Sequence, residues 1–467
     1  MTSAAYDRSK LGTGILHFGP GAFHRAHQAD YVDRLLAQDP RWGIAAVSLR
    51  SAGTVEALRR QDGRYTLAIL DEKTSYRTIA AHNRFFGPGE GQSVRRLLAA
   101  GDIRIVSSTV TEKGYCLAGD GTLDFDHPDI VHDLASPETP VSIVGWLALG
   151  LRDRRDGRLA PFTPLCCDNM VSNGKKLRRA VIDYSARLDP ELARWIGGEV
   201  RFPDAMVDSI TPAADDGLRQ MVREATGFDD AAPVRREAYA AWVIEDVLPQ
   251  ASPDLASVGA VMARDVGAWE KAKLRILNGA HSTLAYTGLL LGHDTVADAM
   301  ADRRLADFTQ RLIREDIIPS LAPSPIDLER YAAEILQRFR NPAIRHKLSQ
   351  IAWDGSQKLP YRLLDTIWDA LGRGRGIDRL SVPIAAWMMF IERQARAGAE
   401  IVDPIAGSLI AAVHSGELVE ELLSLRQVFP AYLADRPEFT RGLARAVAIM
   451  REEGVAACIA GEELKIV

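Results

Sequence analysis

The first half of the chain alternates short apolar runs with segments in which apolar residues recur at helical spacing. Apolar runs of about four to eight residues that end at turn residues are typical of buried strands. The runs with this pattern are Ile15–Phe18, Ile44–Leu49, Tyr65–Leu70, Ile103–Val110 and Phe162–Cys167. Helical spacing follows the first run up to about Ala37, and Thr54 can cap another helix. Strands that alternate with helices predict an α/β fold with a mainly parallel, doubly wound sheet.

From about Asp265 the pattern changes, because long segments with helical spacing dominate and strand-like alternation almost disappears. The predicted helices are Trp269–Gly288, Ala306–Asp316, Ile326–Arg340, Tyr361–Gly372, Val382–Gly398 and Pro437–Arg451. We therefore predict two domains, an α/β domain over residues 1–262 and a mainly α-helical domain over residues 263–467.

Composition excludes several classes of protein. The 467 residues are 47% hydrophobic and 25% charged, as in ordinary globular proteins. A net charge of −5 gives no reason to expect binding to nucleic acid or to an acidic membrane surface. We find neither a signal-like apolar core at the N-terminus nor an uncharged apolar run of about 18 residues. Four cysteines are too few for a disulfide framework, so we expect reduced thiols and a cytoplasmic location.

A glycine turn, Gly19-Pro20-Gly21, follows the first predicted strand directly. Glycines in such a turn let the backbone approach a phosphate, and the following helix N-terminus favours an anion. The full dinucleotide fingerprint has a third glycine, whereas this chain has Phe23 and His24. We predict that Gly19, Gly21, Phe23 and His24 bind a dinucleotide cofactor, with a plain strand-ending turn as the alternative.

The end of the second predicted strand normally distinguishes NAD from NADP. An acidic residue there binds the ribose 2′-hydroxyl of NAD, whereas an arginine suits the 2′-phosphate of NADP. This chain has Arg50 and no neighbouring carboxylate. That favours NADP, but a solvated loop residue would look the same, so NAD and NADP both stay open.

The densest candidate chemistry lies in residues 269–282. On an α-helix with about 100° per residue, Glu270, Lys273, Asn278 and His281 share one arc of about 140° together with two leucines. Because burial lowers the pKa of a lysine, Lys273 could remove a hydroxyl proton. Asn278 and His281 could donate hydrogen bonds to the developing alkoxide, and Glu270 could carry the proton to solvent.

The alternative interpretation of this segment is a solvated helix face with charge pairs one turn apart. We expect that outcome for Lys271 and Arg275. We prefer the catalytic interpretation for the other polar residues because Asn278 and Gly279 are poor helix formers with no obvious packing reason to be there.

Three further polar residues are candidates for substrate contacts. Asn169 follows the last predicted strand of the first half, and ligands bind at the carboxyl ends of parallel strands. It could help Asn278 hold the substrate oxygen, although an Asx turn is the alternative. Asp208 is a similar candidate. Lys358 lies in a polar segment, 354–362, that we interpret as a loop able to supply a cationic contact or as a solvated turn.

Other dehydrogenase chemistries fit less well. The cysteines and the ten scattered histidines lack the spacing of zinc ligands, so no metal is predicted. The Tyr-x-x-x-Lys pair of short-chain dehydrogenases occurs only at Tyr6 and Lys10, before the glycine turn. A metal-free mechanism that depends on a lysine remains.

These motifs are recognisable together. Over nearly its whole length the chain resembles the long-chain polyol dehydrogenase family of mannitol 2-dehydrogenases and D-mannonate oxidoreductases. The motifs that carry the resemblance are Gly19–Gln28, Thr111–Tyr115, Cys167–Asn169 with Asn173-Gly174, Met206–Asp208, Lys273-x4-Asn278-x2-His281 and Asp354–Lys358. The lysine signature is highly specific, whereas the glycine turn alone is not.

The resemblance implies a role for each residue of the catalytic set. Lys273 looks like the general base, and Asn169 and Asn278 look like the oxyanion hole. His281 would orient the substrate, and Glu270 would be the proton-relay acid.

The resemblance also implies the context of these residues. Asp208 and Lys358 match the polyol-contacting positions of the family. The family implies a metal-independent NAD(P) enzyme with a Rossmann-type N-terminal domain and a helical C-terminal domain, occurring as a monomer or a weak homo-oligomer.

One departure bears on the substrate. Some mannitol 2-dehydrogenases have Arg and His where this chain has Gln350 and Trp353, and the run from 350 to 362 looks more like the mannonate branch. We predict reversible hydride transfer between D-mannonate and D-fructuronate, with D-mannitol and D-fructose as the alternative. Selectivity for a carboxylate would need a cation such as Lys358 or Arg362. A non-catalytic nucleotide-sensing module would predict a gap in the catalytic set, and the sequence has none.

Overall fold

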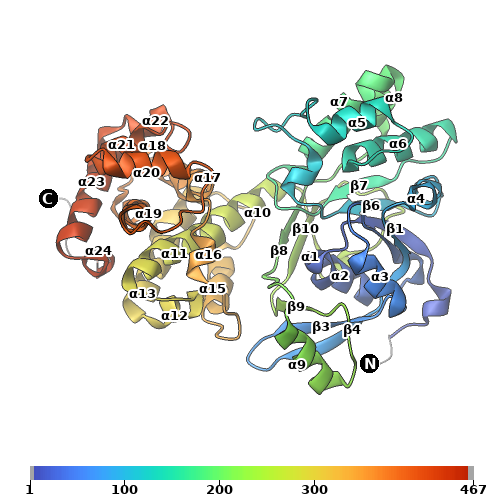
Figure 1. Ribbon diagram of the computed structural model, residues 1–467, viewed down its shortest axis with the longest axis horizontal. Coiled ribbons are helices and arrows are strands. Elements are labelled where there is room, and N and C mark those ends of the chain that lie inside the picture. Colours follow the sequence, from blue (N-terminus) through green and yellow to red (C-terminus); the bar gives the residue numbers. More distant parts are fainter. Residues whose placement is uncertain (1–4, 461–467) are drawn as a thin grey trace. The chain divides into compact units, whose positions relative to one another are not determined.

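The structure is a computed structural model that describes residues 5–460 of the chain (Figure 1). The chain divides into two compact units, Met1–Gly267 and Ala268–Val467. No helix among residues 5–460 is long and apolar enough to cross a membrane.

The first unit is built on a five-stranded parallel sheet with the strand order β5-β2-β1-β6-β7. Its strands are β1 (Thr13–Phe18), β2 (Gly43–Val47), β5 (His82–Phe86), β6 (Ile105–Ser108) and β7 (Thr163–Cys166). The chain builds the sheet outward from β1 in one direction and then in the other, so the topological switch point lies between β1 and β6. This confirms the predicted Rossmann-type sheet.

Helices cover both faces of this sheet (Figure 1). Along β1, Leu16 packs with helices α4, α6, α7 and α8, whereas its neighbour Ile15 packs with α2 and α3, because successive strand residues point to opposite faces. The helices are α1 (Ala22–Ala26), α2 (Gln28–Leu35), α3 (Gly53–Arg60), α4 (Gly91–Leu98), α5 (Pro128–Ala135), α6 (Ile143–Asp156), α7 (Asn173–Leu188), α8 (Pro190–Glu199) and α9 (Asp216–Thr226). The short 3-10 turns are η1 (Arg8–Lys10), η2 (Pro40–Trp42), η3 (Glu112–Tyr115) and η4 (Ala256–Val258).

Two small sheets complete the first unit, with the orders β4-β3-β9 and β11-β10-β8. Their strands are β3 (Tyr65–Leu70), β4 (Ser75–Ile79), β8 (Ala205–Asp208), β9 (Val234–Glu237), β10 (Ala241–Glu245) and β11 (Val261–Ala263). The predicted strand Tyr65–Leu70 exists, but it lies outside the large parallel sheet. It pairs with β4 as an antiparallel hairpin, because only the four residues 71–74 separate the two strands.

The second unit is helical, and no β-strand occurs among its described residues. The helices are α11 (Gly279–Leu291), α12 (Val296–Ala301), α13 (Arg303–Arg311), α14 (Ile318–Leu321), α15 (Leu328–Phe339), α16 (Leu348–Ile351), α17 (Gly355–Leu359), α18 (Asp365–Gly372), α19 (Asp378–Arg396), α20 (Ala406–His414), α21 (Leu418–Ser424), α22 (Ala431–Ala434), α23 (Pro437–Glu452) and α24 (Val455–Ala460). α19 packs against both α11 and α23, and its Trp387 is fully buried in the hydrophobic core of this unit.

Three helical stretches of the second unit contain π-helical segments, in which the backbone hydrogen bonds run from residue i to i+5. These are η5 (Lys273–Asn278), η6 (Leu312–Ile317) and η7 (Pro360–Leu364). The continuous helix predicted over Trp269–Gly288 therefore consists of α10 (Val266–Ala272), η5 and α11. The regular pitch expected for an α-helix is therefore interrupted at the lysine signature.

Candidate active site

The glycine turn after β1 lies beside the switch point of the parallel sheet. Gly19 has a φ of +86°, and a Cβ atom there would lie 2.1 Å from the carbonyl oxygen of Thr109, which follows β6. Only glycine fits such a close approach. At Gly21, by contrast, a Cβ atom would meet nothing closer than 3.9 Å. Because no packing contact requires glycine there, its missing side chain leaves the backbone open to a ligand, as a phosphate-binding turn requires.

The side chain of His24 points into the protein. It is 1% exposed, stacks on His17 at 3.4 Å between ring centroids, and lies with its Nε2 atom 3.0 Å from Nε2 of His82. Burial, followed by the neighbouring histidines, holds its pKa well below the ordinary value. A contact of His24 with a cofactor would therefore go through its backbone. Phe23 is partly exposed and stacks on His27, with the centroids 5.0 Å apart.

Arg50 follows β2 and forms an ion pair that the sequence did not reveal. Its Nη2 atom lies 2.6 Å from Oδ2 of Asp129 on α5, 79 residues further along the chain, while 75% of the Arg50 side chain is exposed. The carboxylate that is missing from the local sequence is thus supplied by a distant segment. Nothing in the residue spacing could have indicated this pairing.

The segment after β7 is tied to the segment after β6 by one carboxylate. Asp168 accepts hydrogen bonds from the backbone of Val110 at 2.9 Å and Thr111 at 3.2 Å, and from the hydroxyl of Tyr115 at 2.7 Å. Burial raises the pKa of Asp168, whereas these hydrogen bonds lower it. The neighbouring Asn169, a predicted catalytic residue, is exposed at the carboxyl end of β7, where parallel sheets bind ligands.

Asn173 joins β7 to β8. Its amide nitrogen donates to the carbonyl oxygens of Cys166 at 3.2 Å and Ala205 at 2.7 Å, and its amide oxygen accepts from the Ala205 backbone at 2.9 Å. β8 ends at Asp208, the predicted polyol-contacting residue, which is 5% exposed. Asp168 and Asn173 stood among the family motifs without a role, and the structure gives both of them the role of fixing strand ends.

In the second unit, Lys273 and Asn278 are the first and last residues of η5. They are five residues apart, which is the spacing of a backbone hydrogen bond in a π-helix. Each residue of a π-helix turns less about the axis than a residue of an α-helix, so Asn278 lies closer in direction to Lys273 than the regular helix predicted. Segments of this kind are frequent at functional sites.

Two expectations about this helix are wrong. Gly279 does have a packing reason, because a Cβ atom there would lie 3.0 Å from the carbonyl oxygen of Arg362 in η7. Arg275 is not solvated, because its side chain is buried and forms an ion pair with Asp369 at 2.6 Å. Lys271 is exposed, as expected.

His281 is buried in the second unit with part of its ring unsatisfied. The ring lies against Phe339 at 4.5 Å and edge-on to His346 at 5.3 Å. Burial, together with His346 and Arg362, holds the pKa of His281 well below its ordinary value, so the imidazole is neutral near pH 7. Among the described residues its buried Nε2 atom has no hydrogen-bond partner. Since buried polar atoms are normally paired, we take this atom as a candidate contact for a bound ligand.

The predicted polar loop that contains Lys358 is instead helical, formed by α17 and η7. Lys358 donates to the carbonyl oxygen of Trp353 at 2.5 Å, and burial, followed by Arg362, lowers its pKa. Arg362 donates from Nη1 to the hydroxyl of Ser282 at 3.0 Å, next to His281, and burial lowers its pKa to about 10. Within residues 5–460, Arg362 forms no ion pair with a carboxylate.

Glu270, one turn before Lys273, is 7% exposed.

Comparisons with known proteins agree on one family. The model of the mannitol dehydrogenase Rossmann domain matches residues 13–257, and the model of the mannitol dehydrogenase C-terminal domain matches residues 265–451. The chain is 38% identical to D-mannonate oxidoreductase of Escherichia coli (strain K12), over 98% of this chain and 97% of that protein.

Solved structures extend this similarity to the fold. Mannitol 2-dehydrogenase of Pseudomonas fluorescens, in a ternary complex with NAD and D-mannitol, is 34% identical with a TM-score of 0.83, covering 98% of this chain and 95% of the other. A substrate-free D-sorbitol dehydrogenase is 32% identical with a TM-score of 0.91, covering 98% and 96%. The protein therefore belongs to the mannitol dehydrogenase family of oxidoreductases, dehydrogenases that act on CH–OH groups.

Proposed function

We propose that the protein is an NAD-dependent dehydrogenase that interconverts D-mannonate and D-fructuronate. The observation that carries this choice is Arg362, a partly buried guanidinium whose pKa is lowered and whose partner within residues 5–460 is a hydroxyl and not a carboxylate. A buried cation is costly unless an anion compensates it. A sugar acid brings that anion, whereas a neutral polyol such as D-mannitol does not. The similarity to D-mannonate oxidoreductase points in the same direction.

The proposed mechanism assigns proton transfer to the helix that contains η5. Lys273 removes the proton of the reacting hydroxyl, and Glu270 relays it onward. Asn278 and the neutral His281 donate hydrogen bonds to the oxygen as negative charge develops on it. A bound nicotinamide cofactor would supply the acceptor for the hydride. In the first unit, the proposed oxyanion donor is Asn169 and the proposed polyol contact is Asp208. Substitution of each residue would test its role.

NAD is the cofactor that we propose, with NADP as the alternative. Gly19 and Gly21 would lie against the pyrophosphate, because Gly19 permits the tight turn at the switch point and the missing side chain of Gly21 leaves the backbone open. The pairing of Arg50 with Asp129 supports NAD, because the 2′-phosphate of NADP would have to compete with this carboxylate for the guanidinium. NAD is also the cofactor bound by the Pseudomonas enzyme.

A matrix of substrates and cofactors tests the proposal. Reduced-nicotinamide absorbance would be followed with mannonate, mannitol, altronate and arabinitol, each with NAD and with NADP. We expect mannonate with NAD to give the highest kcat/KM. A higher value for mannitol would favour the alternative substrate. Cofactor binding without turnover of any of the four would support the nucleotide-sensing module instead.

Two further properties complete the proposal. We propose a cytoplasmic location, because all four cysteines are free thiols and such proteins are typical of reducing compartments. We also propose a monomer or a weak homo-oligomer that acts on a small molecule, which size-exclusion chromatography with light scattering would test.

A further inference from the structure

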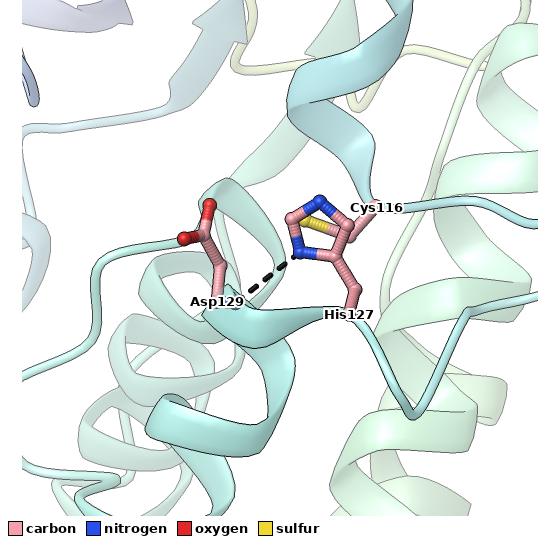
Figure 2. Close-up of side chains that lie close together, drawn as sticks. All are labelled: Cys116, His127 and Asp129. Carbon is pink, nitrogen blue, oxygen red and sulfur yellow. Dashed lines mark hydrogen bonds between the residues drawn. The ribbon is translucent and has the colours of Figure 1, made fainter.

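Three side chains with metal-binding atoms meet in the first unit, away from any sequence motif for a metal. The thiol of Cys116, a ring nitrogen of His127 and a carboxylate oxygen of Asp129 all lie within 4.8 Å of one another (Figure 2). Cys116 follows η3, whereas His127 and Asp129 belong to the start of α5. Ten residues separate the cysteine from the histidine, so folding rather than spacing creates the cluster.

The loop that joins these residues is fixed by its own backbone. The amide of Asp124 donates to the carbonyl oxygen of Cys116 at 2.9 Å, and the amide of His127 donates to the carbonyl oxygen of Asp124 at 3.3 Å. A β-bridge joins Leu117 to Leu123. The ligand atoms are therefore presented from a closed loop rather than from a freely moving segment, which reduces the entropy cost of binding an ion.

The surroundings of the thiol carry an excess of negative charge. After burial itself, the carboxylates of Asp129, Asp133 and Asp124 raise the pKa of Cys116, to about 12, and Arg50 is the cation that opposes them. Asp133 is held by the hydroxyl of Ser142 at 2.6 Å and lies 3.0 Å from the ring of His132. The negative electrostatic potential that keeps the thiol protonated also attracts a divalent cation.

His127 and Asp129 each have a present partner that a metal could replace. Nδ1 of His127 accepts a hydrogen bond from the backbone of Asp129 at 3.2 Å (Figure 2), and Oδ2 of Asp129 accepts one from Arg50 at 2.6 Å. Because Arg50 is mostly exposed, its ion pair is screened by solvent and easily exchanged. One sulfur, one nitrogen and one oxygen form a ligand set that suits Zn²⁺, with a fourth position for water.

We propose that Cys116, His127 and Asp129 bind a thiophilic divalent cation of the Zn²⁺ class and that binding releases Arg50 from Asp129. The thiol loses its proton to solvent as the sulfur–metal bond forms, so no oxidant or reductant takes part. The site is separate from the lysine mechanism and does not depend on the dehydrogenase activity. Metal binding at this site would therefore change the partner of Arg50, which follows β2.

Cobalt is the probe, because Co²⁺ bound to a thiolate gives a charge-transfer absorption in the near ultraviolet. We expect the full-length protein to bind one Co²⁺ with this absorption and Zn²⁺ to displace it. The Cys116→Ser variant should lose the absorption, and Asp129→Asn, which keeps the shape of the side chain, should weaken Zn²⁺ binding at least tenfold. Cys458→Ala, in the second unit, is the matched control and should behave as the parent protein.

Two more measurements separate the site from its alternatives. Zn²⁺ affinity should rise by about tenfold per pH unit near neutrality, because one thiol proton is released. Arg50→Gln should tighten Zn²⁺ binding, since Asp129 is then unpaired with a cation. No charge-transfer absorption, or the same absorption in Cys116→Ser, would overturn the site. Equal Zn²⁺ affinity in the parent and Arg50→Gln would overturn the competition with Arg50.

Discussion

Replacing Arg362 by glutamine should separate the stability of the protein from its activity. Partial burial lowers the pKa of Arg362 from its ordinary value to about 10. At about 1.4 kcal/mol per pH unit, this difference sets an upper limit of about 3 kcal/mol on the cost of the charge to the folded state, because solvent screens the partly exposed side chain. Glutamine keeps a donor for the hydroxyl of Ser282 and removes the charge. We therefore expect Arg362→Gln to leave the free energy of unfolding unchanged or to raise it, by at most about 3 kcal/mol.

The sign of the pH dependence follows from the same difference. The folded state binds the guanidinium proton less tightly than the unfolded state does, so the cost is fully present below pH 10. Stability should therefore rise as the pH increases above about 10 in the parent protein through this group, and this increment should be absent in the variant.

Activity should respond in the opposite direction. A charge-assisted hydrogen bond to the substrate carboxylate contributes about 1.5–3 kcal/mol, so kcat/KM for mannonate should fall by about 10- to 150-fold. The value for mannitol, which has no carboxylate, should change much less. Urea unfolding and steady-state kinetics with both substrates provide the readouts. Arg303→Gln is the matched control, because that side chain is 94% exposed.

Two outcomes would refute this reasoning. A clear loss of stability in Arg362→Gln would mean that the guanidinium is a structural group whose charge the folded protein already compensates. An equal loss of kcat/KM for mannonate and mannitol would mean that Arg362 does not bind the substrate carboxylate.

Three other substitutions test separate steps. Lys273→Ala should abolish turnover above background while NAD binding, followed by fluorescence titration, stays nearly intact; unchanged turnover would exclude Lys273 as the base. Gly279→Ala should destabilise the protein by about 1–3 kcal/mol in urea unfolding, because the new methyl group would lie 3.0 Å from the carbonyl oxygen of Arg362. Asp129→Asn should raise the ratio of kcat/KM for NADP to that for NAD by several fold, because Arg50 is then available to a 2′-phosphate; a constant ratio would remove Arg50 from cofactor selection.

Four strands of the parallel sheet, β1, β2, β6 and β7, could be predicted from the sequence because they lie in short, buried apolar runs. The edge strand β5 could not, because it reads His-Asn-Arg-Phe-Phe and is partly exposed. The small sheets could not. β4 reads Ser-Tyr-Arg-Thr-Ile and is partly exposed, and β8 to β11 have three to five residues each, so neither composition nor length separates them from loops. The pairing of β3 with β9 depends on contacts between residues that are far apart in the chain.

The candidate site, too, could be predicted only in part from the sequence. The polar residues around Lys273 could be found from composition and helical spacing alone. The π-helical form of the segment could not, because it accompanies the close packing of Gly279 on the backbone of Arg362, more than 80 residues away. The pairing of Arg50 with Asp129 is equally distant, so its bearing on cofactor choice appears only in the folded chain.

The π-helical segment η5 makes the number of residues between Lys273 and His281 as important as their identity. In a regular helix, removing one residue rotates everything beyond it by about 100°. Deletion of one residue between Lys273 and Asn278 would rotate His281 relative to Lys273. Only one of these two side chains could then keep its present orientation. Insertions and deletions at this segment should therefore mark members of the family whose chemistry has changed, even where the lysine itself is retained.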